Sequence, residues 1–535
     1  MKKKRTIPHT YVIVFFIVIF CAILTWFVPG GEFEREIINL PDGTAREVIV
    51  KDSFHYTDNV PQTYEMFSAF FDGFVDKADI IIFILMIGGA FWIMNDSKAI
   101  DVGISTFLRK TKRFEHFKLF KFLGIDNIII TLIMIIFSIF GAVFGMSEET
   151  IAFIIIFVPL ALSMGYDSIV GVNMCFVAAG LGFAGALLNP FTIGIAQGLS
   201  GIPLFTGIEY RFFTWIVLNI VGITYVLRYA KKVKKNPESS IVFEDDNKNW
   251  RNKEHIDTEN LKYYTPKSAW IIYGIISAAL VVISFLNSST VLAIGNSSTT
   301  IPIIPILTGL FIILGPLVLR KSVHFFILNI LLFTIFFLIV GVMGYGWYVM
   351  EIATLFFVMG LAAGIANNNS PNKITNLFLE GAKDIASAAL IVGLAGGIII
   401  ILQEGKIIDT ILHSVSQSMK TMGKVGSIGV MYMIQTFINI IIPSGSAKAA
   451  LTMPIMAPFS DLIGISRQAT VMAFQFGDGF TNMITPTSGV LIGVLGVAKI
   501  PYEKWVKWIT PFMIILILLG FLLLIPTVLM DLNGF

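Results

Sequence analysis

An apolar run over residues 466–500 is interrupted by the stretch Phe476-Gly477-Asp478-Gly479-Phe480-Thr481-Asn482-Met483-Ile484-Thr485-Pro486-Thr487-Ser488-Gly489. Hydrocarbon offers no hydrogen-bond partners to backbone amides, so irregular backbone at membrane depth survives only against protein or a water-filled cavity. Proline removes an amide donor, and the glycines on both sides permit an unwound segment. The stretch therefore predicts a functional break in a membrane helix, since it holds more polar groups than a kink needs. A kinked helix with satisfied hydroxyls is the alternative.

A second break is predicted in the apolar run 168–205. It reads Leu188-Asn189-Pro190-Phe191-Thr192 and is followed by Gly194, Gln197, Gly198 and Gly201. The residue before a proline is biased away from the helical conformation, so the helix should end there.

Composition places these breaks in a membrane protein. Of the 535 residues, 56% are hydrophobic and only 14% are charged, whereas a soluble domain is usually about 25% charged. So few charges cannot cover a protein of this size, and much of its surface must face something apolar. This excludes a soluble enzyme, a disordered chain and a nucleic-acid binder. The net charge of +3 says little about partners.

Residues for catalysis or metal binding are scarce. Cys21 and Cys175 lie in apolar runs, and the six histidines fall in loops or at segment ends. The sequence has no GxxxxGK[ST], HExxH or GxSxG motif. We therefore expect no enzyme activity, no metal site and no cofactor, with H+ or Na+ as a coupling ion.

Eleven segments are apolar and long enough to cross a bilayer, which takes about 20 residues. They are 10–29, 79–95, 168–205, 212–229, 269–286, 303–319, 325–344, 348–366, 384–403, 466–500 and 507–530. The first follows Lys2-Lys3-Lys4-Arg5 and could be a secretory signal peptide. It lacks a small-x-small cleavage site and many spans follow it, so we interpret it as the first transmembrane helix of an all-α polytopic membrane protein.

Basic residues gather in loops on one predicted side of the membrane. These are 97–126, the start of 230–268, Arg320-Lys321 and 499–507, whereas 286–302 carries no charge. Lys and Arg are retained on the cytoplasmic side, which places the N-terminus in the cytoplasm. The polar stretch 230–268 is then a cytoplasmic linker.

Matching residues at a fixed offset indicate an internal duplication. Pairs 308 positions apart are Asp72-Gly73 with Glu380-Gly381, Gly88-Gly89 with Gly396-Gly397, and the segment Lys98 to Asp101 with Lys406 to Asp409. After the long basic loop 109–126 the offset becomes 298, as for Ile202-Pro203 and Ile500-Pro501. By span count the second copy begins on the opposite side, so the copies are inverted, an architecture of secondary transporters. The predicted divisions are a first repeat at 1–229, the linker at 230–268, three linking spans at 269–344 and a second repeat at 345–535.

Two further apolar stretches, 127–163 and 427–463, are each split by a polar knot. The knots are 144–150, Phe-Gly-Met-Ser-Glu-Glu-Thr, and 443–449, Pro-Ser-Gly-Ser-Ala-Lys-Ala. Each could be a surface turn between two ordinary spans. We favour re-entrant hairpins, because the second arms are short and contain proline. A hairpin tip offers free amides and carbonyls that can hold a carboxylate or a cation.

The candidate substrate-binding residues are the polar side chains of these tips and breaks. They are Ser147, Glu148, Glu149, Thr150, Asn189, Thr192, Ser444, Ser446, Lys448, Asp478, Thr481, Asn482, Thr485, Thr487 and Ser488. A charge at membrane depth costs at least ~2.5–3.5 kcal/mol, which makes it a functional candidate. Three acids against Lys448 suit a basic or zwitterionic amino acid better than a dicarboxylate. Lys448 could bind a substrate carboxylate or neutralise one of the acids, and an acid could carry a coupling proton.

The motifs of the second half resemble a known family. Pro443 to Ala449, Ala473 to Asn482 and Thr485 to Gly489, with the opening Ile7 to Tyr11, resemble the YfcC-like branch of the anaerobic C4-dicarboxylate carrier (DcuC-type) family in the ion transporter superfamily. The resemblance implies an inverted-repeat transporter with two re-entrant hairpins in the cytoplasmic (inner) membrane of a bacterium, often as a homodimer. Sodium-coupled relatives carry a Ser-Asn-Thr motif at the hairpin tips, which this chain lacks.

We therefore expect a secondary active transporter, either an antiporter or an ion-coupled symporter, with about 11 spans and two hairpins. Exchange of basic amino acids such as arginine and ornithine is the favoured function, and a C4-dicarboxylate carrier is the alternative. The expected partners are a small-molecule substrate and the lipid bilayer. An ion channel is disfavoured because the chain has no continuous ring of repeated charges or carbonyl motifs, and a membrane enzyme because it has no nucleophile–base spacing.

Overall fold

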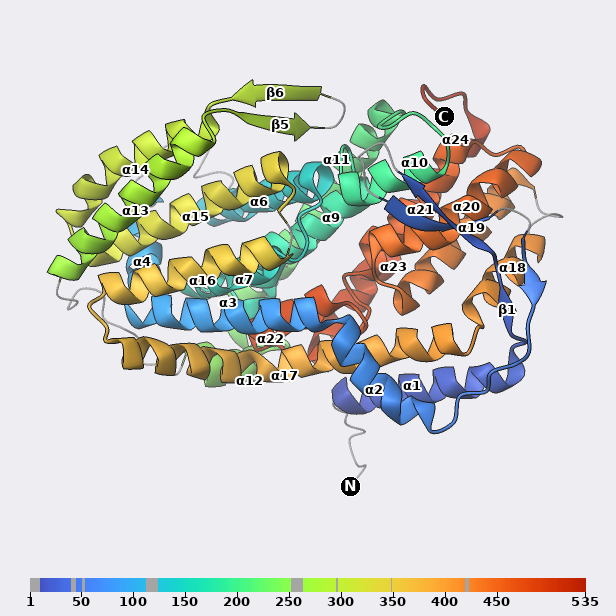
Figure 1. Ribbon diagram of the computed structural model, residues 1–535, viewed down its shortest axis with the longest axis horizontal. Helices are drawn as coiled ribbons and strands as arrows, with labels where there is room; N and C mark the ends of the chain where they lie inside the picture. Colours follow the sequence, from blue (N-terminus) through green and yellow to red (C-terminus); the bar gives the residue numbers. More distant parts are fainter. Residues whose placement is uncertain are drawn as a thin grey trace.

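The protein is mostly helical (Figure 1), which confirms the predicted all-α fold class of a polytopic membrane protein. The computed structural model describes residues 10–39, 45–50, 53–111, 124–251, 263–294, 297–347, 349–418 and 423–535. The basic residues 2–5, the opening residues 7–9 and the middle of the basic loop 109–126 lie outside these ranges. Within them, nine helices are long and apolar enough to cross a membrane, or up to ten if one bent pair counts as a single span.

Elements of the first half alternate between long helices and short connections. They are α1 (Thr10–Phe27), β1 (Gly31–Glu32), β2 (Arg35–Asn39), β3 (Ala45–Ile49), β4 (His55–Tyr56), α2 (Glu65–Asp76), α3 (Ala78–Asp96), α4 (Ala99–Thr111), α6 (Ile125–Ile139), η2 (Phe140–Phe144), α7 (Thr150–Ser163), α8 (Ser168–Val172), η3 (Asn173–Val177), α9 (Ala178–Gly185), η4 (Pro190–Gly194), α10 (Ile195–Leu199) and α11 (Ile208–Lys235).

The linker and the second half follow. Their elements are η5 (Pro237–Ser239), α12 (Phe243–Asp246), η6 (Asn247–Arg251), α13 (Lys267–Leu286), β5 (Thr290–Ile294), β6 (Ser297–Ile301), α14 (Ile303–Leu319), α15 (Val323–Tyr345), α16 (Val349–Ala366), α17 (Pro371–Glu404), α18 (Ile408–Ser418), α19 (Lys424–Ile441), α20 (Gly445–Leu462), α21 (Arg467–Thr481), α22 (Gly489–Ala498), α23 (Tyr502–Leu524) and α24 (Pro526–Leu529). The strands form three antiparallel pairs, β1 with β4, β2 with β3 and β5 with β6. Each of the eleven predicted spans corresponds to a helix or a broken helix, but α1, α14 and α22 are too short to count among the nine. The nine instead include Ile125–Phe144 and Lys424–Ile441, which were predicted as the first arms of the two hairpins.

Left-handed backbone recurs at the spacing of the predicted repeat. Lys98 and Lys406, 308 positions apart, have φ values of 58° and 55°. Gly201 and Lys499, 298 positions apart, have φ values of 65° and 58°. Lysine rarely adopts this conformation, because its Cβ approaches the backbone too closely. The same unusual turn therefore ends corresponding segments in both halves.

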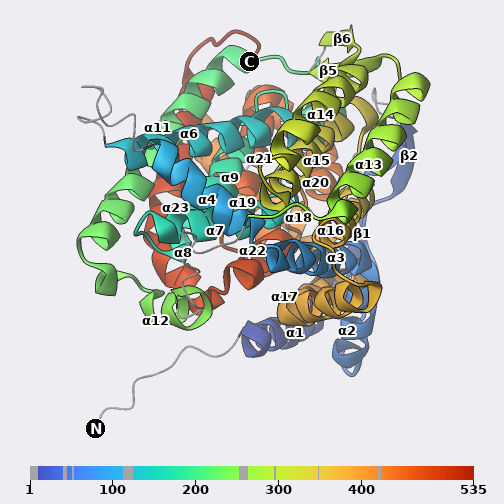
Figure 2. The same ribbon diagram turned by 90° about the vertical axis from the view of Figure 1, so that its left-hand side faces the viewer.

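Glycine contacts between α17 and the α2–α3 pair also have reciprocal partners. A Cβ on Gly396 would lie 2.6 Å from the carbonyl oxygen of Gly73, and one on Gly88 would lie 3.0 Å from that of Gly381. Adding or subtracting 308 converts one contact into the other, as at an interface between equivalent elements. Figures 1 and 2 both show α17 alongside α3 and α2. Because glycine has no side chain, the backbones of the two helices can come this close, as in other membrane helix pairs.

The second polar knot is shorter than predicted. Helix α19 ends at Ile441 and α20 begins at Gly445, so only 442–444 is irregular and the predicted tip residues 445–449 are helical. The reason is local: the Ser444 hydroxyl accepts from the amide of Ala447 at the start of α20, and the alanines that follow favour helix. In the first half the irregular backbone covers 145–149, close to the prediction.

Both breaks are also displaced from their predicted positions. Helix α21 continues to Thr481, so the second break covers 482–488, and the first covers 186–189. Gly477 and Gly479 do not unwind the helix. A Cβ on Gly477 would lie 2.8 Å from the amide nitrogen of Thr436, and one on Gly479 would lie 2.5 Å from that of Ala184. These glycines admit the neighbouring helices α19 and α9.

Candidate functional site

The two tips and the two breaks, predicted from separate parts of the sequence, meet in space. A Cβ on Gly145, in the first tip, would lie 2.6 Å from Oδ1 of Asn189 in the first break. A Cβ on Gly445, beside the second tip, would lie 2.8 Å from Cγ2 of Thr192, just after the first break, and 3.2 Å from Oδ2 of Asp478, one turn before the second break. Substitution of either glycine would therefore push a tip away from a break.

Asn189 organises the first break. Its side-chain oxygen accepts from the amides of Phe191 and Thr192 at 2.9 and 3.2 Å, the usual role of an N-cap residue. Its amide nitrogen donates to the carbonyl of Gly141 at 3.2 Å, which ties the break to η2. The side-chain amide of the predicted site residue Asn189 is therefore hydrogen-bonded to backbone groups of the protein itself.

Arg211 is a buried cation that the sequence analysis did not single out. It lies in α11 and is fully buried. Its guanidinium donates to the carbonyls of Ala186 and Leu187 at 3.1 and 3.2 Å, and to those of Phe205 and Thr206. These bonds satisfy carbonyls that the end of α9 leaves free.

We expect Arg211→Met to lower the free energy of unfolding by about 3 kcal/mol, because the carbonyls of Ala186, Leu187 and Phe205 lose their donor, whereas that of Thr206 keeps a hydrogen bond from Gln197. Arg211→Lys should recover part of the loss, since an ammonium offers three donors against five. Thermal unfolding in detergent measures both. An unchanged unfolding temperature for Arg211→Met would contradict this role.

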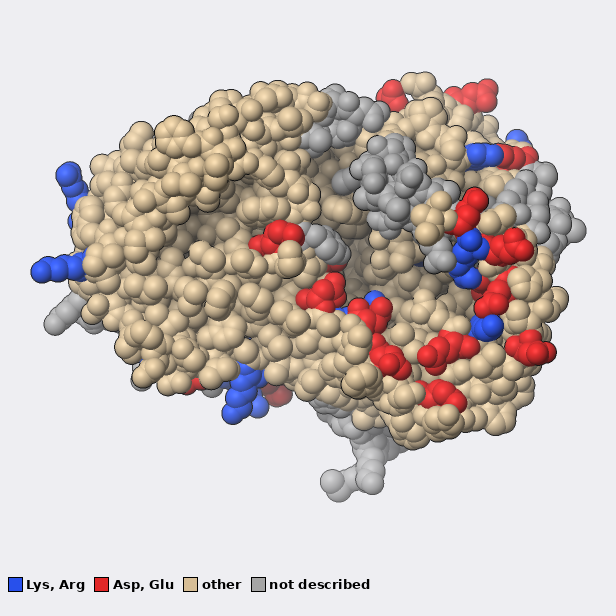
Figure 3. Space-filling view, in the orientation of Figure 1, with Lys and Arg blue, Asp and Glu red and all other residues tan. Residues whose placement is uncertain are grey.

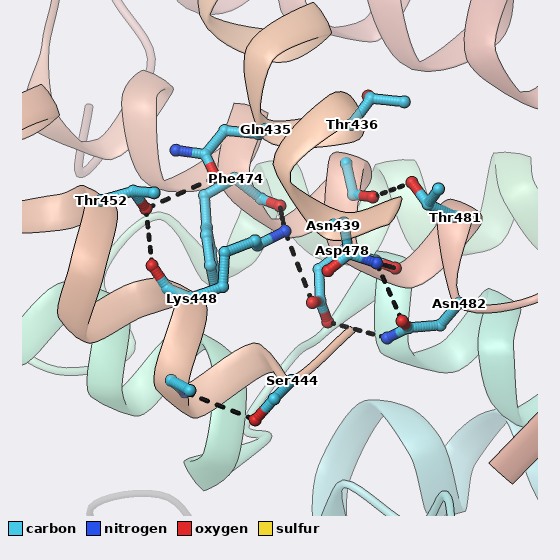
Figure 4. A network of polar contacts seen from close by, with 12 residues as sticks. Gln435, Thr436, Asn439, Ser444, Lys448, Thr452, Phe474, Asp478, Thr481 and Asn482 are labelled. Carbon is cyan, nitrogen blue, oxygen red and sulfur yellow. Dashed lines mark hydrogen bonds and ion pairs between the residues drawn. The ribbon is translucent and has the colours of Figure 1, made fainter. Parts of the chain in front are cut away.

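Lys448 and Asp478 form an ion pair at the centre of the second half (Figure 4). The Lys448 Nζ lies 3.4 Å from Asp478 Oδ1, and the two side chains are 0% and 1% exposed. Nζ also donates to the carbonyl of Phe474 at 3.4 Å and lies 4.5 Å from the centre of the Phe474 ring. Of the two predicted uses of Lys448, the geometry matches neutralisation of an acid.

An amide network holds the Asp478 carboxylate. Asn482 Nδ2 donates to Asp478 Oδ2 at 3.5 Å. Asn439 Nδ2 donates to Asn482 Oδ1 at 2.8 Å and to the Asp478 carbonyl at 3.3 Å. Figure 4 shows the two asparagines beside the carboxylate. The predicted residues Asp478 and Asn482 are thus brought together.

Gln435 and Asn439 were missed by the sequence analysis. Both lie on α19, four positions apart, so they share one face of the helix. Gln435 Oε1 accepts from Thr452 at 3.4 Å. Within the described part of the chain, Gln435 Nε2, Asn439 Oδ1 and Thr192 Oγ1 are buried polar atoms with no hydrogen-bond partner. Such groups are rare in proteins, and here they surround the ion pair. The spacing of two amides in an apolar run was the available signal.

The first tip carries the remaining acids. Glu149 is buried, and its carboxylate accepts from the amide of Ser147 at 2.9 Å. The Thr150 hydroxyl donates to the Ser147 carbonyl at 2.5 Å. Glu148 is half-buried beside them. The tip is therefore closed by its own polar groups, with two carboxylates adjacent in sequence.

A small pocket separates this first tip from the second break. It is lined by Met146, Ser147, Phe176, Ala179, Gly180, Phe183, Gly479, Asn482 and Met483. Its volume is about 20 Å³, room for about one water molecule. The predicted residues Ser147 and Asn482 both face it, and a larger ligand would require the tip to move.

The other predicted residues have local contacts. The Thr487 hydroxyl donates to the Ile440 carbonyl at 2.6 Å, at the end of α19. The Thr485 hydroxyl lies 2.7 Å from that of Thr487 and 3.2 Å from the same carbonyl, and its one proton can be donated to either. The Thr481 hydroxyl donates to the carbonyl of Gly477 one turn earlier. Ser488 accepts from the amide of Leu491 as the N-cap of α22. Ser446 is half-buried in the first turn of α20.

Comparison with known proteins identifies the family of this chain. Residues 7–529 match the family model described as DcuC, C4-dicarboxylate anaerobic carrier. The Escherichia coli (strain K12) protein YfcC, provisionally described as a basic amino acid antiporter, is 32% identical over 94% of this chain and 93% of its own length. An uncharacterized protein of Haemophilus influenzae is 28% identical over 98% of each chain. The crystal structure of the Alcanivorax borkumensis YdaH transporter aligns with 97% of this chain and 98% of its own, at 15% identity and a TM-score of 0.38. The family match over nearly the whole chain and the identity to YfcC together establish that the chain belongs to the DcuC family of C4-dicarboxylate anaerobic carriers.

Proposed function

We propose that this protein is a secondary active transporter that exchanges basic amino acids, such as arginine for ornithine, across the cytoplasmic membrane. The observation that carries the proposal is the buried ion pair between Lys448 and Asp478. It engages the one cation among the predicted site residues, and the other two acids among those residues, Glu148 and Glu149, lie at the first tip.

The charge balance favours a cationic ligand over a dianion. A dicarboxylate entering this site would have to separate Lys448 from Asp478 and would meet two further acids at the first tip. A buried charge that loses its partner is strongly destabilising. A guanidinium or ammonium group needs no such exchange, because an acid at the first tip can pair with it directly.

An acidic part of the surface supports the same substrate class. Figure 3 shows most acidic side chains of this face gathered in its right-hand half, around a hollow. The described part of the chain from β1 to the start of α3 is rich in acids: Glu32, Glu34, Glu36, Asp58, Glu65, Asp72, Asp76 and Asp79, against Arg35 and Lys77. Two of these acids form ion pairs, Glu32 with Lys406 and Asp76 with Lys77. A charged surround of one sign raises the local concentration of oppositely charged solutes.

An inverted repeat would supply the transport cycle. The recurring left-handed residues and the reciprocal glycine contacts support two equivalent halves. Two re-entrant tips meeting two broken helices would place free backbone groups at the centre of the membrane. With the N-terminus in the cytoplasm, the two near-equivalent packings of the halves would open the site to each side in turn.

A C4-dicarboxylate carrier is the second candidate, because the family model carries that description. Counterflow in proteoliposomes separates the two. Vesicles loaded with arginine, ornithine, lysine, succinate or malate receive labelled arginine or labelled succinate outside.

We expect the vesicles loaded with ornithine or arginine to accumulate at least tenfold more labelled arginine than empty or succinate-loaded vesicles. Empty vesicles serve as the control for exchange. Accumulation of labelled succinate against succinate, with no arginine exchange, would overturn the proposal in favour of the dicarboxylate carrier.

A further inference from the structure

The first part of the predicted linker is docked onto the helical bundle. Residues 236–251, here named the docked linker, contain η5, α12 and η6. Figure 2 shows α12 at the foot of α11, beside α8 and α23. Val242 and Asp246 are 0% and 1% exposed. A linker with only a connecting role would not bury a valine and a carboxylate.

The docked linker contacts the start of the first broken helix. Asp167, the N-cap of α8, accepts from the Ser240 hydroxyl at 2.6 Å. Asp246 accepts from the amide of Ser168 at 2.9 Å. The Arg251 guanidinium donates to the carbonyl of Tyr166 at 2.9 Å.

The docked linker also contacts the second half. Asp245 pairs with Lys504 of α23 at 2.6 Å. The indole nitrogen of Trp250 donates to the carbonyl of Ala498 at the end of α22 at 3.1 Å. The segment therefore joins the start of the first broken helix to the end of the second.

Two carboxylates are buried where the docked linker meets α8. Asp167 accepts three hydrogen bonds, from Ser240, from the Tyr229 hydroxyl at 2.6 Å and from the amide of Val170. Asp246 accepts one, from Ser168. Hydrogen bonds to a carboxylate favour its charged form. Burial raises the pKa of Asp167, against its three hydrogen bonds. Because Asp246 accepts only one such bond, we assign the titrating proton to Asp246.

The surroundings of Asp246 give the direction of its titration. Burial first, then the negative charge of Asp167, raise the pKa of Asp246 to about 7, against the opposing effects of the Ser168 hydrogen bonds and Arg251. Two ion pairs also lie near this junction, Asp245 of α12 with Lys504 of α23 and Lys234 with Asp126 beside Tyr166, and the docked linker itself carries Glu244 and Lys248.

We propose that the docked linker is a pH-sensitive latch, which holds the ends of the two broken helices together when Asp246 is protonated and releases them when Asp246 ionises. The latch acts on the bundle whatever substrate is carried. It would couple transport to the pH of the compartment that the linker faces, the cytoplasm in the orientation proposed above.

The direction of the pH dependence follows from the linkage between proton binding by Asp246 and docking of the segment. In the released state Asp246 would titrate in the ordinary carboxyl range, about 3.9, whereas in the docked state its pKa is raised to about 7. The docked state holds the proton between these values, so docking weakens as pH rises toward 7 and levels off above it. From pH 6 to pH 8 the docking equilibrium should fall about tenfold.

Thiol labelling tests the latch without transport. In a chain whose native cysteines Cys21 and Cys175 are replaced by alanine, Val242→Cys reports release, because Val242 is buried only while the segment is docked. Glu238→Cys, at an exposed position, corrects for the reactivity of the thiol itself. We expect the ratio of the two labelling rates to rise about tenfold from pH 6 to pH 8.

Matched variants separate the latch from a general effect of pH. Asp246→Asn cannot ionise, so its ratio should stay low and constant. Asp167→Asn removes the neighbouring negative charge and should move the midpoint to lower pH. Asp245→Asn breaks the Lys504 pair and should raise the ratio at every pH while keeping its pH dependence.

Two results would overturn the latch. One is an equal pH dependence in Asp246→Asn and the unsubstituted chain, and the other is tighter docking at high pH. If Val242→Cys fails to fold, hydrogen exchange of the 236–251 amides, corrected for the intrinsic rate, measures the same equilibrium. Either readout is independent of substrate, so it distinguishes a failed latch from a wrong transport assignment.

Discussion

The substitution Lys448→Met should destabilise the protein by about 3–5 kcal/mol, because it leaves the buried carboxylate of Asp478 without its cation. Asp478 is 0% exposed, so water cannot replace the lost partner. The double variant Lys448→Met/Asp478→Leu removes both charges and should recover most of this loss, as buried pairs replaced by apolar groups commonly do. Thermal unfolding in detergent measures the three proteins.

A surface pair provides the control. Lys373 pairs with Asp96 at 2.8 Å, but its side chain is 50% exposed, so Lys373→Met should cost less than about 1 kcal/mol. If Lys448→Met cost no more than this control, the ion pair would contribute little to the fold. If the double variant were as unstable as the single one, a stranded charge would not be the cause.

The same series separates stability from transport. We expect the double variant to fold but to exchange no arginine, since the site would lose the polar centre that Asn439 and Asn482 enclose. Normal exchange by the double variant would make the pair a structural element alone and would remove the main support for the proposed function.

Polar interruptions of apolar runs made much of the arrangement predictable. A membrane segment cannot leave polar side chains in hydrocarbon at no cost, so Glu148, Asn189, Lys448 and Asp478 marked the places that meet in the structure. Helix boundaries were less predictable, because glycine has two uses. Gly477 and Gly479 looked like unwinding positions, yet they stay helical and bring α19 and α9 close.

Partners across the fold could not be predicted from the sequence. Lys448 had three candidate acids, and only the crossing of α20 with α21 selects Asp478. The four backbone carbonyls bound by Arg211 come from two loops whose approach no local pattern encodes. The docking of residues 236–251 was not predictable for the same reason. The sequence showed only a polar cytoplasmic linker over 230–268, and the burial of Val242 and Asp246 depends on contact with the start of α8.

If Glu149 at the first tip recognises the positive charge of the substrate, Glu149→Gln should reduce arginine exchange about 100-fold. That factor corresponds to about 2.7 kcal/mol of interaction free energy with the substrate. Glutamine is nearly isosteric, and its amide oxygen can still accept from the amide of Ser147, the bond that Glu149 makes now. The tip should therefore keep its shape and lose only a charge. Glu209→Gln is the matched control, because Glu209 is an exposed acid that accepts from Asn533.

Citrulline, the neutral analogue of arginine, distinguishes charge recognition from tip closure. In the unsubstituted protein arginine should be transported far better than citrulline, and Glu149→Gln should narrow that ratio by lowering arginine transport alone. If Glu149 only closes the tip, the transport rates of arginine and citrulline should fall together, and the ratio of the two rates should not change. Glu148→Gln, tested in parallel, shows which of the two adjacent acids meets the substrate. An unchanged ratio in both variants would place charge recognition elsewhere, with Asp478 as the remaining acid that could supply it.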